Sequence, residues 1–162
     1  MYFWLNPNLT QPPMPDQTIY PLFVYGSLLS GFKSPAYEYI SRFFSFVGDA
    51  KVKGKLYDLG TYAAGVSSDE ESYIIGELYT IKQQSEFGWA IGQLDDYEGV
   101  AVESDEIQLY QRGLVDVIIN DSATPAWIYW YMGSVEGKPL IQSGDMIQYL
   151  QQKNNPSATS AP

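Results

Sequence analysis

Two residue types that carry out much of enzyme chemistry are absent from this sequence, which contains no Cys and no His. The absence of Cys excludes disulfides, thiolate nucleophiles and Cys-based zinc sites. The absence of His excludes Ser-His-Asp and Cys-His mechanisms and the usual transition-metal sites. Any proton transfer near neutral pH must therefore use Asp, Glu, Lys, Tyr or water.

Cations are also scarce, because nine Lys and Arg residues stand against 19 Asp and Glu residues, for a formal net charge of −10. No basic stripe is evident, which argues against a nucleic-acid partner. No apolar run reaches transmembrane length, which argues against a membrane partner. Residues 1–5 are apolar but short and lack a basic flank, so they make a poor signal peptide. We expect a soluble, cytoplasmic protein.

Hydrophobic and aromatic residues are abundant, at 45% and 15% of the 162 residues, which suits one globular domain. The 14 Tyr and four Trp residues favour strands and the walls of ligand pockets. Residues 1–20, rich in Pro, Asn and Gln, are predicted to form an irregular N-terminal arm. Residues 21–150 are predicted to form the domain, and residues 151–162 a disordered tail. No sequence feature indicates an oligomeric state.

The apolar patterns predict more strands than helices. Strands are expected at residues 23–25, 51–56, 72–81, 114–119 and 126–132, the last two as a hairpin. Helices are expected from Ser34-Pro35 to Gly48, over residues 85–97, and over residues 146–150 with Asp145 as cap. The strand at 72–81 is apolar on both faces, which predicts a central position. Because strands and helices do not alternate regularly, we predict an α+β fold with a small barrel-like mixed β-sheet and a few flanking helices.

The first candidate site segment is an apolar strand that ends at Tyr25-Gly26-Ser27-Leu28. Gly26 has no Cβ, so the backbone can turn there and present successive N–H groups to a carboxylate or an oxyanion. The alternative is an ordinary turn, which Gly after an apolar strand often marks. Ser27 is not a convincing nucleophile, because no His can activate it and the G-x-S-x-G pattern is absent.

The second segment is the end of the helix predicted at 85–97. Its apolar stripe consists of Phe87, Ala90, Ile91 and Leu94. Glu98 lies about 20° from the line of Phe87 at about 100° per residue. Burial and the negative end of the helix dipole would both raise the pKa of Glu98 toward the range of a general acid/base. The alternative for Glu98 is a hydrogen-bonded capping residue. Asp95 and Asp96 lie off the stripe and are predicted to be solvated.

In this order, Tyr25-Gly26-Ser27-Leu28 and Leu94-Asp95-Asp96-Tyr97-Glu98-Gly99 resemble the motifs of the γ-glutamylcyclotransferase-like (AIG2-like) family. Supporting matches lie at residues 54–60, 76–79, 110–112 and 127–131. The resemblance implies a barrel-like sheet with flanking helices and a pocket at one end. It implies that the Tyr-Gly-Ser-Leu turn binds the γ-glutamyl part of a substrate through backbone amides. It also implies that Glu98 is the acid/base residue and that Tyr110 lies close to the pocket, although Tyr110 also suits an ordinary strand. Ala63 departs from the Pro expected there in many relatives.

The implied reaction is cyclisation of a γ-glutamyl amide to 5-oxoproline, with release of an amine or an amino acid and with no cofactor or metal. Ring closure is intramolecular, so the substrate supplies its own nucleophile to a protein without His or Cys. The predicted catalytic residue is Glu98, and the predicted substrate-binding residues are Tyr25, Gly26, Ser27, Leu28 and Tyr110. The alternatives are a non-catalytic small-molecule-binding module of the same fold and a protein-interaction domain that uses its aromatic residues.

Overall fold

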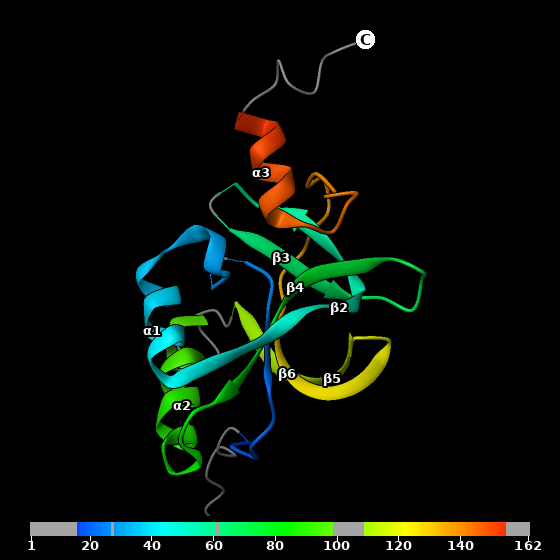
Figure 1. The fold of residues 1–162 in the computed structure, drawn as a ribbon. Coiled ribbons are helices and arrows are strands. Elements are labelled where there is room, and N and C mark those ends of the chain that lie inside the picture. The colour runs from blue at the N-terminus through cyan, green and yellow to red at the C-terminus, as the bar shows by residue number, and fades with distance from the viewer. Residues whose placement is uncertain (1–15, 27, 61, 99–108, 155–162) are drawn as a thin grey trace, which may run out of the picture.

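Five β-strands close into a barrel in the computed structural model, which describes residues 16–26, 28–60, 62–98 and 109–154 (Figure 1). The order around the barrel is β2 (Phe44–Asp58), β4 (Tyr73–Ile81), β1 (Leu22–Val24), β6 (Ser122–Tyr131) and β5 (Tyr110–Ile119). Pairing of β5 with β2, with Lys51 opposite Ile118, closes the barrel. Strands β1 and β6 run parallel and the other neighbours antiparallel, so the predicted barrel-like mixed sheet of an α+β fold is confirmed.

A sixth strand and three α-helices complete the described part of the chain. Strand β3 (Ala63–Ser67) pairs antiparallel with β2 outside the barrel. Helices α1 (Pro35–Phe43) and α2 (Phe87–Glu98) lie side by side, and the Tyr39 hydroxyl on α1 donates a hydrogen bond to the Ala90 carbonyl on α2 at 3.0 Å. Helix α3 (Met146–Asn154) lies at the other end of the molecule (Figure 1).

Helix α1 begins as predicted but ends earlier. The Ser34 side chain accepts a hydrogen bond from the Tyr37 N–H at 3.0 Å, and Pro35 is the first helical residue. Apolar spacing had extended this helix to Gly48, but Phe44 instead begins β2, which pairs with β4 and carries a bulge between Phe46 and Gly48. Aromatic and β-branched residues favour strands, and the neighbouring strand that decides their conformation is not visible in local spacing.

Strand β4 lies between β2 and β1, as its apolar faces predicted. Its inward residues Ile74 and Leu78 are buried. Between them, Gly76 allows β1 to approach closely, because a Cβ at this position would overlap the carbonyl oxygen of Val24. The short first strand is therefore held in the middle of the sheet.

The predicted hairpin is confirmed and is longer than expected. It comprises β5 and β6, which pair along their whole length from Tyr110 opposite Tyr131 to Ile119 opposite Ser122. Asn120 and Asp121 connect the strands with φ angles of 52° and 64°. Asn and Asp tolerate this left-handed conformation, which a tight hairpin turn requires.

Both ends of the described chain attach to the barrel or its helices. In the arm, the Gln17 side-chain amide donates to the Gly88 carbonyl on α2 at 3.2 Å. The Asp145 carboxylate accepts from the Gln148 N–H at 3.1 Å, so the predicted cap is confirmed. Helix α3 continues to Asn154, so residues 151–154 of the predicted disordered tail are helical, whereas residues 1–15 and 155–162 lie outside the described residues.

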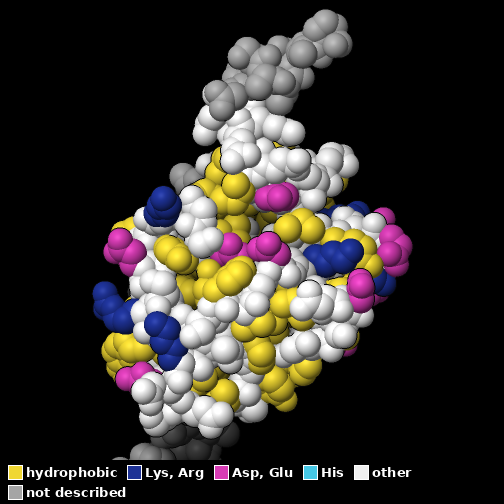
Figure 2. Space-filling view, in the orientation of Figure 1, with side chains coloured by type: hydrophobic (Ala, Val, Ile, Leu, Met, Phe, Trp, Pro, Cys, Tyr) yellow, Lys and Arg dark blue, Asp and Glu magenta, His cyan; other side chains and the backbone are white. Residues whose placement is uncertain are grey.

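The surface in Figure 2 shows hydrophobic side chains interspersed with charged and polar ones. Among the residues that the structure describes, none of the helices combines the length and apolar character needed to span a membrane.

Candidate active site

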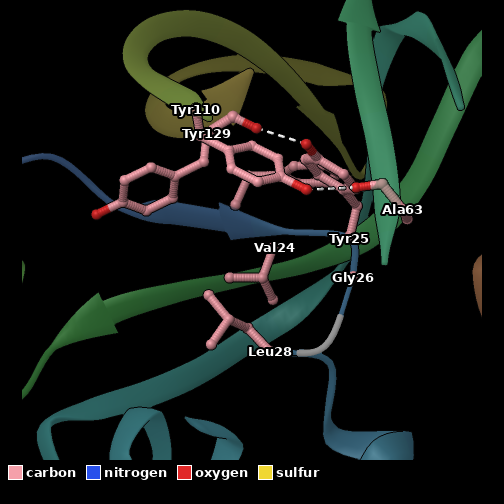
Figure 3. A pocket seen from close by; sticks show the side chains of 8 residues that line it. Val24, Tyr25, Gly26, Leu28, Ala63, Tyr110 and Tyr129 are labelled. Atoms are coloured by element: carbon pink, nitrogen blue, oxygen red, sulfur yellow. Dashed lines mark hydrogen bonds between the residues drawn. The ribbon is translucent and has the colours of Figure 1, made fainter. Parts of the chain in front are cut away.

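A cavity of about 40 Å³ lies at one end of the barrel (Figure 3). It is lined by Phe23, Val24, Tyr25, Gly26, Leu28, Ala63, Tyr110 and Tyr129. These residues come from β1 and the turn after it, from the starts of β3 and β5, and from the end of β6. Because β1 runs parallel to β6 and β5 runs antiparallel to it, these strand ends meet at the same place. In Figure 3, Tyr110 and Tyr129 lie on one side of the cavity, and Val24 and Leu28 lie on the other.

Hydrogen bonds fix the two predicted tyrosines in the cavity wall. The Tyr25 hydroxyl donates to the Tyr129 carbonyl at 2.5 Å and accepts from the Gly65 N–H at 3.1 Å. Gly65 is needed for this approach, because a Cβ there would lie 2.6 Å from the Tyr25 ring. The Tyr110 hydroxyl donates to the Ala63 carbonyl at 2.8 Å. Both rings are therefore held by backbone groups of neighbouring strands.

The turn after β1 is closed by a backbone hydrogen bond from the Leu29 N–H to the Gly26 carbonyl at 2.9 Å. Ser30, which follows this turn, is bound by Glu77 on β4. The Glu77 carboxylate accepts from the Ser30 N–H at 2.9 Å and from the Ser30 hydroxyl at 2.6 Å. The Tyr79 hydroxyl donates to the same carboxylate at 2.9 Å. Burial and this contact with Glu77 raise the pKa of Tyr79 above its ordinary value, so Tyr79 remains a neutral hydrogen-bond donor.

Position 98 is the last residue of α2. The four stripe residues that precede it, Phe87, Ala90, Ile91 and Leu94, are all buried as predicted. Glu98 shares their face by its spacing along the helix. Its side chain and Ser27 lie outside what the structure describes, so their roles remain predictions.

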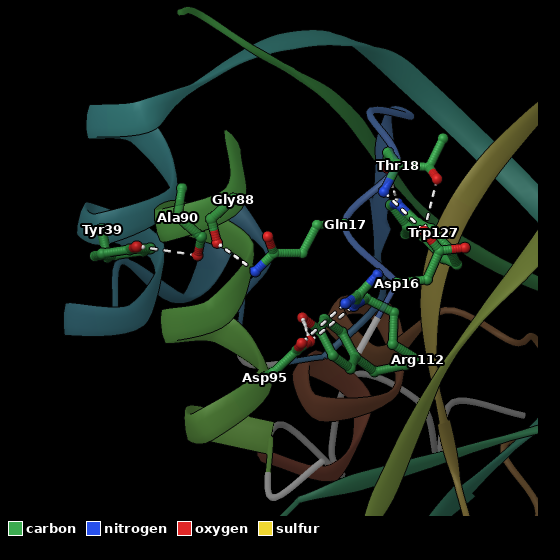
Figure 4. A network of polar contacts seen from close by, with 10 residues as sticks. Asp16, Gln17, Thr18, Tyr39, Gly88, Ala90, Asp95, Arg112 and Trp127 are labelled. Carbon is green, nitrogen blue, oxygen red and sulfur yellow. Dashed lines mark hydrogen bonds and ion pairs between the residues drawn. The ribbon is translucent and has the colours of Figure 1, made fainter. Parts of the chain in front are cut away.

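Asp95 is buried, so the prediction that it is solvated was wrong, whereas Asp96 is exposed as predicted. Arg112 on β5 donates to the two carboxylate oxygens of Asp95 from Nε at 2.8 Å and from Nη2 at 2.9 Å (Figure 4). The Tyr129 hydroxyl adds a third hydrogen bond to Asp95 at 2.8 Å. The side chains of Asp95 and Arg112 are only 2% and 3% exposed. The Arg112 cation offsets the cost of removing the Asp95 carboxylate from water. Because Arg112 lies on another element, residue spacing along α2 could not reveal this pairing.

The guanidinium group of Arg112 also makes a cation–π contact with Trp127, with its central carbon 4.5 Å from the centre of the ring. Burial by itself lowers the pKa of Arg112, but the hydrogen bonds and charge of Asp95 outweigh burial and raise the pKa above its ordinary value. Arg112 therefore keeps its positive charge in the folded protein. Among the described residues, no group of three or more Asp and Glu side chains lies close enough to bind a metal ion.

Tyr25, Gly26, Leu28 and Tyr110, predicted from the sequence as site residues, are brought together in one cavity. Sequence reasoning did not assign Ala63 or Tyr129 to the site. The sequence did contain a signal for Tyr129. Arg112 lies two positions after Tyr110 and therefore on the same face of its strand, and Tyr129 lies opposite Arg112 in the predicted hairpin. The signal for Asp95 is its spacing, since it lies only about 40° beyond Ile91 on the helix surface.

The fold and the cavity define a small closed-barrel domain in which a Gly-containing turn after the first strand meets tyrosines from the last hairpin. The chain belongs to the family described as gamma-glutamyl cyclotransferase, AIG2-like, whose sequence profile matches residues 22–148. A comparison with curated proteins found no match.

Several solved structures share the fold. YkqA from Bacillus subtilis is 25% identical with a TM-score of 0.62, and the match covers 86% of this chain and 43% of YkqA. The chain thus spans less than half the length of that relative. YtfP from Escherichia coli is 27% identical with a TM-score of 0.54, over 80% of this chain and 97% of YtfP. An AIG2-like protein from Mus musculus is 20% identical with a TM-score of 0.56, over 77% and 87% of the two chains, a likeness of fold alone.

Proposed function

We propose that this protein is a γ-glutamyl cyclotransferase, which converts a γ-glutamyl amide to 5-oxoproline and releases an amine or an amino acid. One observation carries the proposal: Tyr25, Gly26, Leu28 and Tyr110, singled out as binding residues from the sequence, line one cavity in a chain of this family. The proposed substrate is a small γ-glutamyl compound in the cytoplasm, and the proposed reaction uses no cofactor.

The cavity and the turn suit the charged end of such a substrate. At about 40 Å³, the cavity has room for roughly three water molecules. In the proposal, the α-carboxylate of the γ-glutamyl group displaces this water and binds the peptide N–H groups of the turn from Gly26 to Leu28. The tyrosine rings pack against the glutamyl methylene groups, and the leaving amine lies at the open side of the cavity.

Glu98 is the proposed acid/base residue. Its carboxylate removes a proton from the α-ammonium group, and the resulting amine attacks the γ-carbonyl carbon. A new C–N bond closes the five-membered lactam as the original amide C–N bond breaks. Glu98 then donates this proton to the leaving nitrogen. The second proton that ring closure leaves on the lactam nitrogen passes through Glu98 to the released amine, which departs as an ammonium group, so protons balance and no water is consumed. Binding the chain in a bent conformation supplies much of the acceleration, because the reacting atoms belong to one molecule.

A turnover screen tests the proposal. The full chain is incubated with γ-glutamyl amino acids, γ-glutamyl amines and a γ-glutamyl-lysine isopeptide, and 5-oxoproline is measured by mass spectrometry. We expect turnover of at least one class. Glu98→Gln should reduce kcat on the order of 100- to 10,000-fold, the usual contribution of a positioned acid/base group.

Glu86→Gln is the matched control, because Glu86 is an exposed residue just before α2 and undergoes the same chemical change. Its rate should equal that of the unmodified protein. An unchanged rate in Glu98→Gln would remove Glu98 from the mechanism. Binding of γ-glutamyl compounds by calorimetry without any 5-oxoproline would instead favour the non-catalytic binding module.

A further inference from the structure

The Asp95–Arg112–Tyr129 cluster links the helix that ends at Glu98 to the cavity. Arg112 on β5 and Tyr129 on β6 are directly opposite each other across the hairpin. Both donate to the one carboxylate of Asp95 on α2, so three hydrogen bonds hold the helix to two strands. Tyr129 itself lines the cavity, and its carbonyl accepts the Tyr25 hydroxyl. One residue, Tyr129, therefore contacts both the cavity and α2.

The end of α2 has little intrinsic stability, which makes this attachment necessary. Gly88 and Gly92 lower the helix propensity of the segment. The last turn contains no basic residue, while Asp95, Asp96 and Glu98 place negative charge at the negative end of the helix dipole. A helix end of this composition frays unless tertiary contacts hold it. Asp95 supplies such contacts one turn before Glu98.

Stability alone gives no reason for a charged pair at this place. A buried ion pair is seldom more stabilising than well-packed apolar residues of the same volume, because both charges lose their hydration. What a bidentate pair adds is a defined direction and distance, since the planar guanidinium fits the carboxylate in one arrangement. Glu98 follows Asp95 by three positions, which corresponds to about 4.5 Å along the helix axis and about 60° around it.

We propose that Asp95 is a positioning residue, which uses Arg112 and Tyr129 to fix the last turn of α2 and thereby sets the place of the Glu98 carboxyl relative to the cavity. This inference rests on the proposed function for the role of Glu98. Asp95 itself does not touch the substrate in this arrangement; it acts through the helix and through Tyr129.

The test uses Asp95→Asn, which keeps the size of the side chain but removes its charge, and Asp96→Asn as the matched control on the exposed side of the same turn. Tyr129→Phe is a milder second variant, because it removes one hydrogen bond and leaves the ion pair intact. All assays are run at a temperature at which circular dichroism shows each variant fully folded. The kinetic readout is kcat and KM with the best substrate of the turnover screen.

We expect Asp95→Asn to lower kcat roughly 10- to 100-fold with little change in KM, because misplacing a reacting group by about 1 Å can cost on the order of 100-fold. Tyr129→Phe should cause a smaller loss in the same direction, and Asp96→Asn should match the unmodified protein. A folded Asp95→Asn variant with unchanged kcat would overturn the inference. So would an equal loss in Asp96→Asn.

A second readout does not need turnover. The carboxyl carbon of Glu98 is assigned by NMR from its loss in Glu98→Gln, and its titration is followed in the unmodified protein and in Tyr129→Phe, which weakens the attachment without changing any charge near Glu98. Weakening of the attachment should shift the titration curve of Glu98, because its carboxyl group then meets a different environment. Identical titration curves would contradict the positioning role. If no γ-glutamyl compound is turned over, the proposed function fails, and this titration still decides whether Asp95 positions Glu98.

Discussion

Arg112→Met leaves the Asp95 carboxylate buried without its cation. The unmodified pair has two charge-assisted hydrogen bonds at 2.8 and 2.9 Å, and both side chains are almost completely shielded from water. Removing one partner of such a pair costs about 3–5 kcal/mol, because the remaining charge has lost its hydration and has no counter-ion. In a domain of this size, 1 kcal/mol corresponds to about 2–4 °C, so the unfolding midpoint should fall by roughly 6–20 °C.

Removing both charges should be less harmful than removing one. In the double variant Asp95→Leu with Arg112→Met, no buried charge remains, and the apolar side chains fill a similar volume. We therefore expect the double variant to recover most of the stability that Arg112→Met loses, which gives a large coupling free energy in a double-mutant cycle. The measurement is urea unfolding at pH 7 followed by circular dichroism, with the slope of the transition checked for each variant.

Lys53→Met is the control, because Lys53 also pairs with a carboxylate, that of Glu71 at 3.4 Å, but both partners are exposed to water. Its unfolding midpoint should stay close to that of the unmodified protein. An unchanged midpoint in Arg112→Met would refute the reasoning, and so would a double variant as unstable as the sum of the two single variants.

Two further predictions concern the barrel and its attachment to α3. Gly76→Ala should strongly destabilise the protein, because the added Cβ overlaps the Val24 carbonyl oxygen; a normal thermal midpoint would contradict the close pairing of β1 with β4. Hydrogen bonds from the Tyr149 hydroxyl at 2.6 Å and from Lys153 at 3.0 Å lower the pKa of Asp58, the first contact contributing most. The carboxylate therefore adds stability that is complete above the unfolded-state pKa of about 3.9 and is lost as pH falls through the lower folded-state pKa. Asp58→Asn should differ most from the unmodified protein at pH 7 and least at pH 2 in urea unfolding, and a difference independent of pH would argue against this assignment.

Several elements followed from local patterns. The cap at Ser34-Pro35, the buried stripe of α2, the central apolar strand β4 and the existence of the last hairpin were all predicted correctly. Each depends on interactions between residues close in the chain or on which face of an element is apolar. The same local reasoning failed at residues 44–48, where pairing with β4 outweighs an apolar spacing that also suits a helix.

The candidate site, like the fold, could be predicted from the sequence only in part. Gly26, the turn after β1 and the face on which position 98 lies could be derived from order, spacing and residue type. The partners of Asp95 could not, because Arg112 and Tyr129 follow 17 and 34 residues later, on other strands. Ala63 accepts the Tyr110 hydroxyl through its backbone carbonyl. No pattern of side chains in the sequence could have indicated this contact.

The amino-acid sequence by itself determined the available chemistry, since a chain without Cys and His must use Asp, Glu, Lys, Tyr or water for proton transfer near neutral pH. It also determined the family through its ordered motifs. Only the tertiary structure decided which of those groups are neighbours. The tertiary fold brings one end each of β1, β3, β5 and β6 together around the cavity. It also places the Arg112 guanidinium in contact with the Asp95 carboxylate. The physical reason is that charge and hydrogen-bonding capacity belong to individual residues, whereas burial and partnership arise only when distant segments pack together.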